Sequence, residues 1–467
     1  MLEISQIRKN KICLLDYNYK QDIENRVMLS KLTVFELSIL EEILYSSIKT
    51  SINKLSKDLD IPEKKILAVL KKFEKTNLLK IDGEIINIDK KMRKYFEFEY
   101  QRFEENFKPD LLFINNLLHK IPIHILPIWY SIPKSSNNIF TSIIDKYFLT
   151  PQIFQRHLEN IECENPTFLG IVEDVYNSEN FEVESSALQK KHSLEKEKYL
   201  EIILLLEFNL LCFQSYKKTD NGYVEIITPF HEYKDYLQYL NKTKTLSIKD
   251  TKKLIRKRKI DFGFVEDLSS VLKMAKKPIS KSSIEKTIKK ELSIKDPDII
   301  ISKSYIDSII NKLLKIEFLT QKKDLLQFTS SAKKWLDFNL ENKALHLYYH
   351  PLNTLDSAKS FSHLINEKSI REAEKSITRV LDSSWVYFDD FAKGILSAVL
   401  DDQLVKIKHM GKTYKYSIPS HSKEELIFIK KVIFEKLFES CIVAIGSLNG
   451  RDCFSVTKLG KKLFDLT

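Results

Sequence analysis

The stretch ISKSYIDSIINKLLKIEFLTQKKDLLQFTSSAKKWL, residues 301–336, decides how the chain folds. Apolar residues recur through its first half at the spacing of one helical face: Ile306, Ile309, Ile310 and Leu313. Short apolar runs then flank residues 321–324 and predict two strands joined by a turn. A polar residue and a second helical segment follow. We therefore expect a helix, a hairpin and a helix, with Trp335 buried against Ile309 and Leu313.

The same order of segments recurs at three other places: residues 61–96, residues 199–237 and the end of the chain, SLNGRDCFSVTKLGKKLF. Asp82-Gly83 and Asn221-Gly222 mark the turns of the first two copies, as tight hairpins favour. In each copy an apolar strand residue precedes the last helix, and a bulky apolar residue, the anchor, lies within that helix. The four pairs of strand residue and anchor are Ile88 and Tyr95, Ile227 and Tyr236, Phe328 and Trp335, and Val456 and Leu463. Such internal repetition predicts tandem units.

We expect a mainly α chain with short β-hairpins, built from tandem winged-helix (helix-turn-helix) repeats joined by helical linkers. Paired strands are expected at about 78–88, 212–227, 318–328 and 404–456. The expected segments are an N-terminal extension (1–31), winged helix 1 (32–108), a helical region with winged helix 2 (109–240), a basic linker (241–260), winged helix 3 (261–340), a helical connector (341–380) and winged helix 4 with an inserted basic hairpin (381–467).

The net charge of +11, from 75 Lys and Arg against 64 Asp and Glu, favours an acidic partner such as nucleic acid or an anionic membrane surface. Lysine, isoleucine, asparagine, phenylalanine and tyrosine are also the residues that AT-rich coding enriches. Charge alone therefore does not decide between binding and coding bias.

The five cysteines are scattered, odd in number and never spaced as Cys-x-x-Cys, which indicates neither a disulfide framework nor a zinc site. The N-terminal residues mix charges into their apolar positions, unlike a signal peptide. The most apolar run, residues 199–213, is interrupted by Glu201 and Glu207. We expect a cytoplasmic protein without a membrane span.

Basic residues gather on the predicted recognition helix of the first copy, in the linker, around the third copy and on the inserted hairpin, one face of which should be basic. The candidate DNA-contacting residues are Lys64, Lys65, Lys72, Lys75, Lys253, Arg256, Lys257, Arg258, Lys259, Lys303, Lys312, Lys322, Lys323, Lys406, Lys408, Lys412 and Lys415. An exposed lysine face is also what any soluble helix needs. Residues 159–184 carry eight acids and no Lys or Arg, and are interpreted as a loop that repels DNA, contacts a basic partner or is simply solvated.

No catalytic, cofactor or metal site is indicated, so we expect a protein that is not an enzyme and has no small-molecule substrate. Gly411-Lys412-Thr413 resembles the end of a phosphate-binding loop, but Lys406 stands where that motif needs glycine, and strands flank it on both sides. His346 and His350 have the spacing of two metal ligands on a helix, yet a third ligand is lacking. We interpret them as partly exposed packing histidines.

The C-terminal region, residues 264–467, resembles bacterial helicase-associated winged-helix proteins, which are related to the accessory region of XPB-like DNA repair helicases. The residues that carry the resemblance are Trp385, Val386, Asp389, Asp390, Leu437, Phe438, Phe454, Val456, Thr457, Leu459 and Gly460. A second set matches the family's middle motif: Phe328, Thr329, Lys334, Trp335 and Leu336. Ser331 or Ala332 stands where that motif usually has glycine. The resemblance implies a non-enzymatic DNA-binding protein that serves a helicase carried on another chain.

Two alternatives remain open from the sequence. Winged helices also build partner surfaces in chromosome-associated complexes, so the chain could be a protein-interaction scaffold. Plasmid-type replication initiators are built from tandem winged helices as well. A gel shift with competitor DNA separates the DNA-binding function from the scaffold, and a defined repeat-bearing origin would support the replication initiator.

Overall fold

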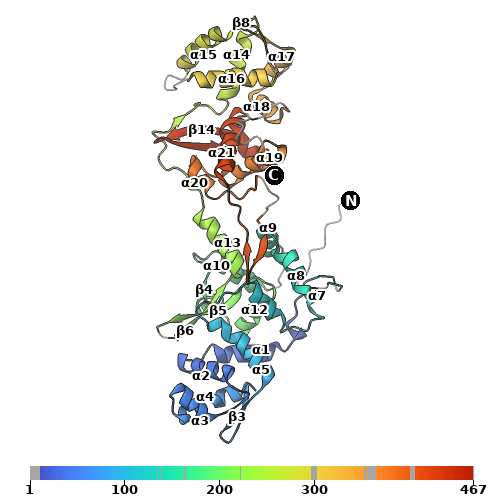
Figure 1. Ribbon diagram of the computed structural model, residues 1–467, viewed down its shortest axis with the longest axis vertical. Coiled ribbons are helices and arrows are strands. Elements are labelled where there is room, and N and C mark those ends of the chain that lie inside the picture. Colours follow the sequence, from blue (N-terminus) through green and yellow to red (C-terminus); the bar gives the residue numbers. More distant parts are fainter. Residues whose placement is uncertain are drawn as a thin grey trace. The chain divides into compact units, whose positions relative to one another are not determined.

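The computed structural model of the chain (Figure 1) describes residues 11–133, 135–136, 138–161, 165–220, 222–295, 302–351, 355, 364–399 and 405–465. It divides into two compact units, each assembled from two separate pieces of sequence. Unit 1 consists of Met1–Tyr239 and Lys406–Ser417, and unit 2 of Leu240–Val405 and Ile418–Thr467. The predicted positions Cys163, Asn221 and Leu404 lie outside the described residues.

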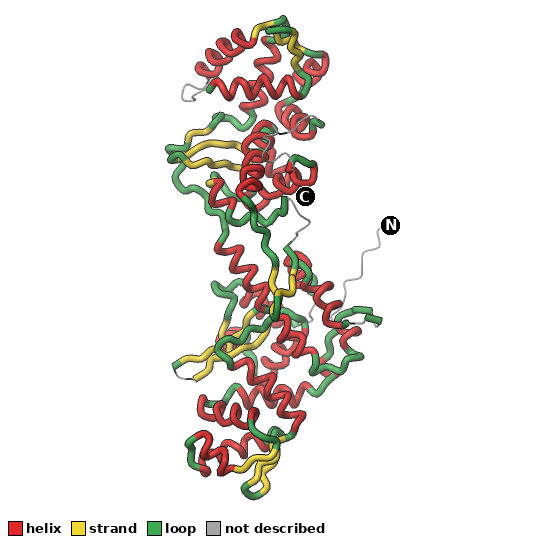
Figure 2. The backbone as a smooth tube through the Cα atoms, viewed as in Figure 1, coloured by secondary structure: helices red, strands yellow, loops and turns green. Residues whose placement is uncertain are grey.

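Helices account for 55% of the structure, and short antiparallel strands stand between them (Figure 2). The hairpins are β2 (Leu79–Asp82) with β3 (Ile85–Ile88), β5 (Phe213–Thr219) with β6 (Gly222–Thr228), β9 (Leu319–Lys322) with β10 (Leu325–Phe328), β12 (Ile407–Met410) with β13 (Thr413–Tyr416), and β14 (Val443–Leu448) with β15 (Arg451–Val456). The prediction of a mainly helical chain with short hairpins at these places is confirmed. Within the described ranges, every helix is too short or too polar to span a lipid bilayer.

One order of elements recurs in the described residues: helix, short strand, two helices, hairpin, helix. Repeat 1 adds α2 (Val34–Tyr45), β1 (Lys49–Ser51), α3 (Ile52–Leu59), α4 (Glu63–Glu74) and α5 (Lys90–Tyr100) to the first hairpin. Repeat 2 adds α10 (Pro166–Tyr176), β4 (Val183–Glu184), α11 (Ser185–Lys191), α12 (Lys196–Phe208) and α13 (His231–Lys242) to the second. Repeat 3 adds α14 (Gly263–Met274), β8 (Ile279–Ser280), α15 (Lys281–Lys295), α16 (Lys303–Lys315) and α17 (Ser330–Leu336) to the third. Repeat 4 adds α19 (Glu367–Lys375), β11 (Val386–Tyr387), α20 (Phe388–Ala392), α21 (Lys423–Lys431) and α22 (Lys458–Phe464) to the last.

The other described helices connect or precede these repeats. They are α1 (Tyr19–Leu29), α6 (Leu111–Leu118), α7 (Leu126–Trp129), α8 (Ile139–Ile143), α9 (Pro151–Glu159) and α18 (Leu340–Tyr349). Short 3-10 or π turns lie at Leu14–Asp16, Gln101–Phe103, Ile144–Phe148, Ser376–Val380 and Val432–Leu437.

All four repeats share one sheet order, because the short first strand pairs with the second strand of the hairpin. The orders are β1-β3-β2, β4-β6-β5, β8-β10-β9 and β11-β15-β14. In repeat 4 a further strand, β7 (Ile255–Arg256), pairs with the free edge of β14. Gly446 is required there, since a Cβ would lie 2.6 Å from the carbonyl oxygen of Ile255. The predicted basic linker therefore contributes a strand to the folded core of unit 2.

Local sequence signals explain how repeat 1 forms. Thr33 and Glu36 make a capping box that begins α2, and the Ser51 side chain caps α3. The turn between β2 and β3 has Gly83 in the left-handed region, with φ of 60°, where a side chain would be strained. These signals fix the ends of the helices and the register of the hairpin.

The predicted anchors of the last helices are correct in position in repeats 2 and 3, where Tyr236 and Trp335 are buried. Trp335 is 1% exposed and belongs to the same core as Ile309 and Leu313, which confirms its predicted burial. In repeats 1 and 4 the buried residue lies one position later than predicted, at Phe96 and Phe464. The helix turns the predicted residue toward the edge of the core in both cases.

The acidic segment 159–184 is not a single loop in its described residues. It folds into α10 and β4, and the apolar face of α10 buries Phe168, Ile171 and Val175. Its acids include side chains paired inside unit 1: Asp174 contacts Lys191, and Glu182 lies 2.6 Å from Lys234. The interpretation of this segment as a loop was therefore wrong, because apolar residues at helical spacing outweighed the charge pattern.

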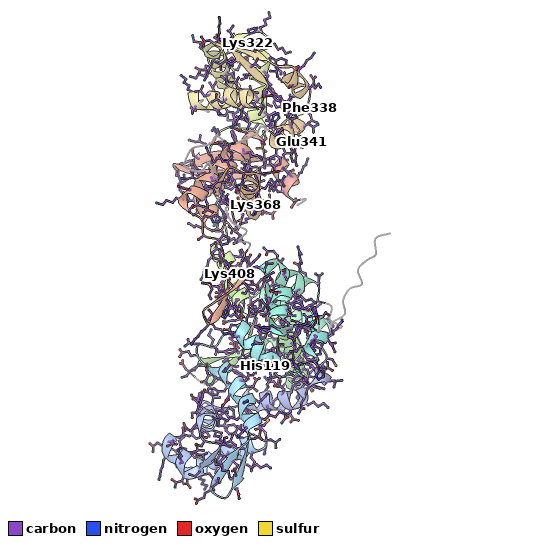
Figure 3. The ribbon with its side chains drawn as sticks, turned by 45° about the vertical axis from the view of Figure 1, so that its right-hand side comes forward. His119, Lys322, Phe338, Glu341, Lys368 and Lys408 are labelled. Atoms are coloured by element: carbon purple, nitrogen blue, oxygen red, sulfur yellow. The ribbon has the colours of Figure 1, made fainter. Side chains whose placement is uncertain are left out.

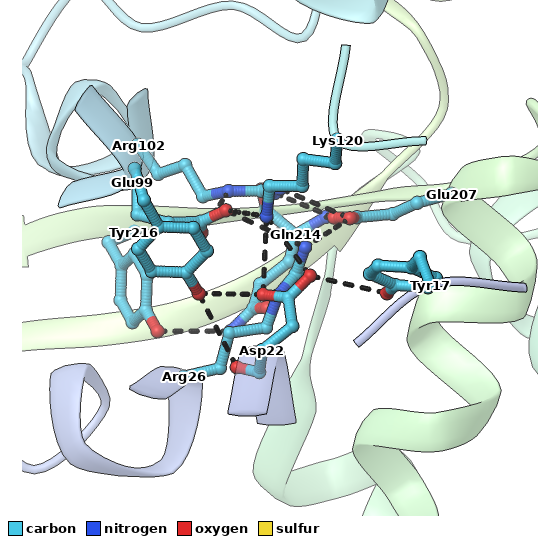
Figure 4. A network of polar contacts seen from close by, with 10 residues as sticks. Tyr17, Asp22, Arg26, Glu99, Arg102, Lys120, Glu207, Gln214 and Tyr216 are labelled. Carbon is cyan, nitrogen blue, oxygen red and sulfur yellow. Dashed lines mark hydrogen bonds and ion pairs between the residues drawn. The ribbon is translucent and has the colours of Figure 1, made fainter. Parts of the chain in front are cut away.

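A buried network of charged side chains joins repeats 1 and 2 within unit 1 (Figure 4). Glu207 of α12 is fully buried and accepts hydrogen bonds from Arg26 at 2.7 Å and from Arg102 at 2.6 Å. Arg102 also lies 2.9 Å from Glu99 of α5. The two arginines therefore connect α1 and the turn after α5 to α12 through Glu207, and Arg102 also contacts α5 through Glu99.

Lys120 and Asp22 complete the network on its other side. Asp22 of α1 lies 3.2 Å from Arg26 and 3.1 Å from Lys120, and Tyr95 donates to it at 2.6 Å. Three cations and three carboxylates, each paired with others, make the network electrically neutral. A neutral, hydrogen-bonded cluster of this kind fixes the packing of the helices that supply it.

Candidate nucleic-acid interface

In repeat 1, helices α3 and α4 are joined by a short turn, residues 60–62. Asp60 adopts φ of 55° and ends α3. The turn is held by Ser56, whose hydroxyl donates to the carbonyl of Ile61 at 2.6 Å. The buried side of α4 carries apolar residues: Ile66, Val69, Leu70 and Phe73. The opposite side of α4 is therefore presented to solvent.

This outward side of α4 is basic. Lys64, Lys65 and Lys75 are exposed. Lys72 is also exposed but donates a hydrogen bond to the buried carboxylate of Glu36 on α2. Burial raises the pKa of Glu36, but hydrogen bonds from Lys72 and Thr33 outweigh that effect and hold the pKa below its ordinary value. Lys72 therefore also ties α4 to α2.

The basic run 253–259 is only partly available to a partner. Arg256 lies in β7, 2.7 Å from Asp261, with its guanidinium 5.5 Å from the ring of Trp385. Arg258 is 4% exposed and lies 3.0 Å from Asp267, which holds it inside unit 2. The prediction that Arg258 contacts phosphate was wrong, because the side chain is enclosed and its charge is neutralised.

The other basic residues of the run lie at the surface. Lys253, Lys257 and Lys259 are exposed. The Lys257 ammonium lies 5.4 Å from the ring centres of both Tyr305 and Phe438. These three lysines remain candidates for phosphate contact.

In repeat 3 the hairpin tip is basic and exposed, but one of the predicted DNA-contacting residues is buried. Lys322 and Lys323 are exposed at the turn between β9 and β10, and Figure 3 labels Lys322 there. Lys303 is exposed at the start of α16. Lys312, however, is 6% exposed and lies 2.5 Å from Glu439, so its predicted role in binding DNA was wrong.

The hairpin of β12 and β13 interrupts repeat 4 in the sequence but belongs to unit 1. The main-chain N–H of Ile407 donates to the carbonyl of Leu149 at 2.9 Å, and the Tyr416 hydroxyl donates to the carbonyl of Phe148 at 2.9 Å. Ile407 and Tyr416 are paired across the strands and buried on one face. No local signal in the sequence indicates this docking site, which lies more than 250 residues away along the chain.

The other face of this hairpin is basic, as expected. Lys408 is directly opposite Lys415, and both are exposed (Lys408 is labelled in Figure 3). Lys412 is exposed beside the turn at Gly411, and Lys406 is half-buried at the base. No Asp or Glu occurs in residues 405–417. Like charges directly across a strand pair destabilise it, and residues 405–417 supply no carboxylate that would offset the two ammonium groups.

The two spaced histidines take part in packing. His346 and His350 lie on and just after α18, and both rings contact Phe318, with centroids 5.8 and 5.9 Å away. Burial lowers the pKa of both imidazoles. Within the described part of the chain, no group of three or more His, Cys, Asp or Glu side chains could hold a metal ion.

No protein-family model matches this sequence, and no curated protein matches it either.

Proposed function

We propose that this protein binds DNA through tandem winged-helix units and acts without catalysing a reaction. The element order and sheet order shared by the four repeats support the winged-helix assignment. In that fold the second helix of the helix-turn-helix enters the major groove and the hairpin contacts phosphates. The exposed lysines of α4 lie on a helix that corresponds to this second helix, and those of the β9–β10 turn lie at the tip of a hairpin.

The observation that carries the proposal is the paired lysines of the β12–β13 hairpin. Lys408 and Lys415 face each other on a ribbon that contains no acid, and the ribbon is fastened to unit 1 by its opposite face. Phosphate groups of a polyanion would relieve this repulsion, and each phosphate neutralised would release counterions. Because the C-terminal region resembles helicase-associated winged-helix proteins, we further propose that the protein assists an XPB-like helicase.

Replacing both Lys408 and Lys415 with Gln is expected to weaken the binding of duplex DNA of any sequence. Losing two phosphate contacts should reduce the slope of log affinity against log salt by nearly one unit each, or roughly 1.8 in total. Fluorescence anisotropy of a labelled duplex at several salt concentrations measures this. The matched control replaces Lys191 and Lys198, which are exposed but paired with Asp174 and Glu201.

An unchanged slope in the hairpin variant would remove the hairpin from the interface. Absence of any DNA binding by the full chain at low salt would contradict the proposal as a whole and favour the protein-scaffold alternative.

Replacing Lys64 and Lys65 with Ala should change sequence preference, because the recognition helix of a winged helix reads base edges. Selection from random duplexes, followed by sequencing, measures the preference of each variant. A double variant at Lys90 and Lys91, exposed on α5, carries the same charge change and should keep the native preference. Equal shifts in both variants would show that α4 contributes only charge.

A further inference from the structure

The helix before the hairpin has the same register in all four repeats. These helices are α4, α12, α16 and, in repeat 4, α21 with the π turn that continues it. Each is followed by one residue in the left-handed conformation, and the four residues are Asn77, Leu210, Glu317 and Cys441, with φ of 61°, 67°, 58° and 59°. A lysine five positions earlier is paired with a carboxylate in three of the repeats: Lys72, Lys312 and Lys436. The left-handed residue therefore marks equivalent positions of the four helices.

Two equivalent positions on the outer side of this helix differ sharply between repeats. Six residues before the left-handed residue, the chain has Lys71, Leu204, Asn311 and Glu435. Two residues before it, the chain has Lys75, Phe208, Lys315 and Glu439. A helix that enters a DNA groove needs exposed hydrogen-bonding side chains at such positions and no excess of negative charge. Only the helices of repeats 1 and 3 meet this requirement.

The helix of repeat 2 is covered. Leu204 and Phe208 are 0% exposed, and the Phe208 ring lies 5.3 Å from the rings of both Tyr17 and Trp129. The outer side of α12 therefore packs against residues that precede repeat 2 in unit 1, so it cannot enter a groove.

The helix of repeat 4 is acidic at the same positions. Glu435 lies 3.8 Å from Lys431, and Glu439 lies 2.5 Å from Lys312 of repeat 3. These carboxylates belong to ion pairs within unit 2 and would repel phosphate groups. Repeats 2 and 4 are thus structural, and each unit keeps one open helix: α4 in unit 1 and α16 in unit 2.

The open side of α16 carries amide and hydroxyl groups. Asn311 is exposed, and its amide makes no hydrogen bond with another described residue. Ser304 and Ser308 lie on the same side, seven and three residues earlier. In α4 the equivalent residues are Lys64, Ala68 and Lys71. Because lysine pairs best with guanine and asparagine with adenine in the major groove, the two helices suit different bases.

We propose that α4 and α16 are the two groove-reading helices among the four, and that the DNA site is bipartite, with Asn311 selecting an adenine in the part read by α16. The amide Nδ2 donates to adenine N7, and Oδ1 accepts from the N6 amino group. The exposed Lys322 and Lys323 of the same repeat would hold phosphates beside this part. The inference rests on the proposed binding of DNA and specifies which helices read it.

Selection of long random duplexes by the full chain, followed by sequencing, tests the inference. The native protein should enrich two separate groups of base pairs. Asn311→Ala should remove the preference for adenine in one group only, and the Lys64 and Lys65 double variant should alter only the other. Asn342→Ala is the matched control, because Asn342 is exposed on α18 of the same unit, and it should keep both groups. For the selected duplex, Asn311→Ala should bind about tenfold more weakly than the native protein, as expected for one bidentate contact with a base.

Three results would count against the inference. If the native chain binds DNA but enriches a single group, or if Asn311→Ala enriches the same sequences as the native protein, the second reading helix is refuted while DNA binding stands. If Asn311→Ala weakens the binding of all duplexes alike, Asn311 contacts the DNA backbone and does not select adenine. A native chain that binds no duplex at low salt would contradict the proposed function and this inference together.

Discussion

Replacing Glu207 with Ala is expected to lower the free energy of unfolding of unit 1 by about 3–5 kcal/mol. The carboxylate is fully buried between Arg26 and Arg102, so its removal leaves two enclosed guanidinium groups with one fewer counter-charge. Urea unfolding followed by the fluorescence of Trp129, with Trp335 and Trp385 replaced by Phe, reports on unit 1.

Glu201→Ala is the matched control for this prediction. Glu201 lies on the same helix and pairs with Lys198 at 2.9 Å, but that pair is at the surface. Its loss should cost at most about 1 kcal/mol. If Glu207→Ala also lowered the free energy of unfolding by only about 1 kcal/mol, the buried network would have to be accessible to water.

The same network makes unit 1 sensitive to acid. Burial raises the pKa of Glu207, but the charges of Arg102 and Arg26 outweigh it, and the pKa falls from 4.5 to about 2. Because the folded-state pKa is depressed, the stability that Glu207 contributes is present above pH 4.5 and is lost as the pH falls toward 2. The difference in unfolding free energy between the native protein and Glu207→Gln should therefore shrink across this window.

Trp335→Ala should cost about 3–5 kcal/mol in unit 2, as truncation of an enclosed aromatic does. The indole is 1% exposed, its N–H donates to the carbonyl of Lys343 at 3.2 Å, and its ring lies 5.5 Å from that of Phe318. Thermal unfolding followed by circular dichroism measures the loss.

Phe338→Ala provides the comparison for Trp335, since Phe338 is 42% exposed three residues later (Figure 3). Its replacement should change stability by less than about 1 kcal/mol. Equal effects of the two substitutions would contradict the burial of the indole in the core of repeat 3.

Hairpins and the helices around them could be predicted because their signals are local. Asp82-Gly83 between two apolar runs specifies a turn, and the periodic apolar residues of α16 specify the face that packs. The first strands of the four sheets were not predicted. β4, β8 and β11 have two residues each, which is too short for alternation to be recognised.

Candidate DNA contacts were harder to predict, because burial and pairing depend on residues far apart in the sequence. Lys303 and Lys312 lie on one helix, yet Lys312 faces Glu439 from another repeat and Lys303 faces solvent. The buried network joins Arg26 to Glu207 across a similar distance in the sequence. Neither ion pair is visible as a pattern of neighbouring residues in the sequence. A single sequence therefore cannot distinguish a lysine that binds DNA from one that pairs with a carboxylate inside the protein.

The two-piece composition of unit 1 has a consequence for synthesis on the ribosome. Residues 1–239 emerge first, but Lys406–Ser417, which docks on Phe148 and Leu149, follows only after unit 2 is largely made. At usual rates of translation this delay is roughly ten to thirty seconds. During that interval the nascent unit 1 exposes the surface that Ile407 and Tyr416 later cover, and only a chain synthesised past residue 417 carries the basic hairpin in its final place.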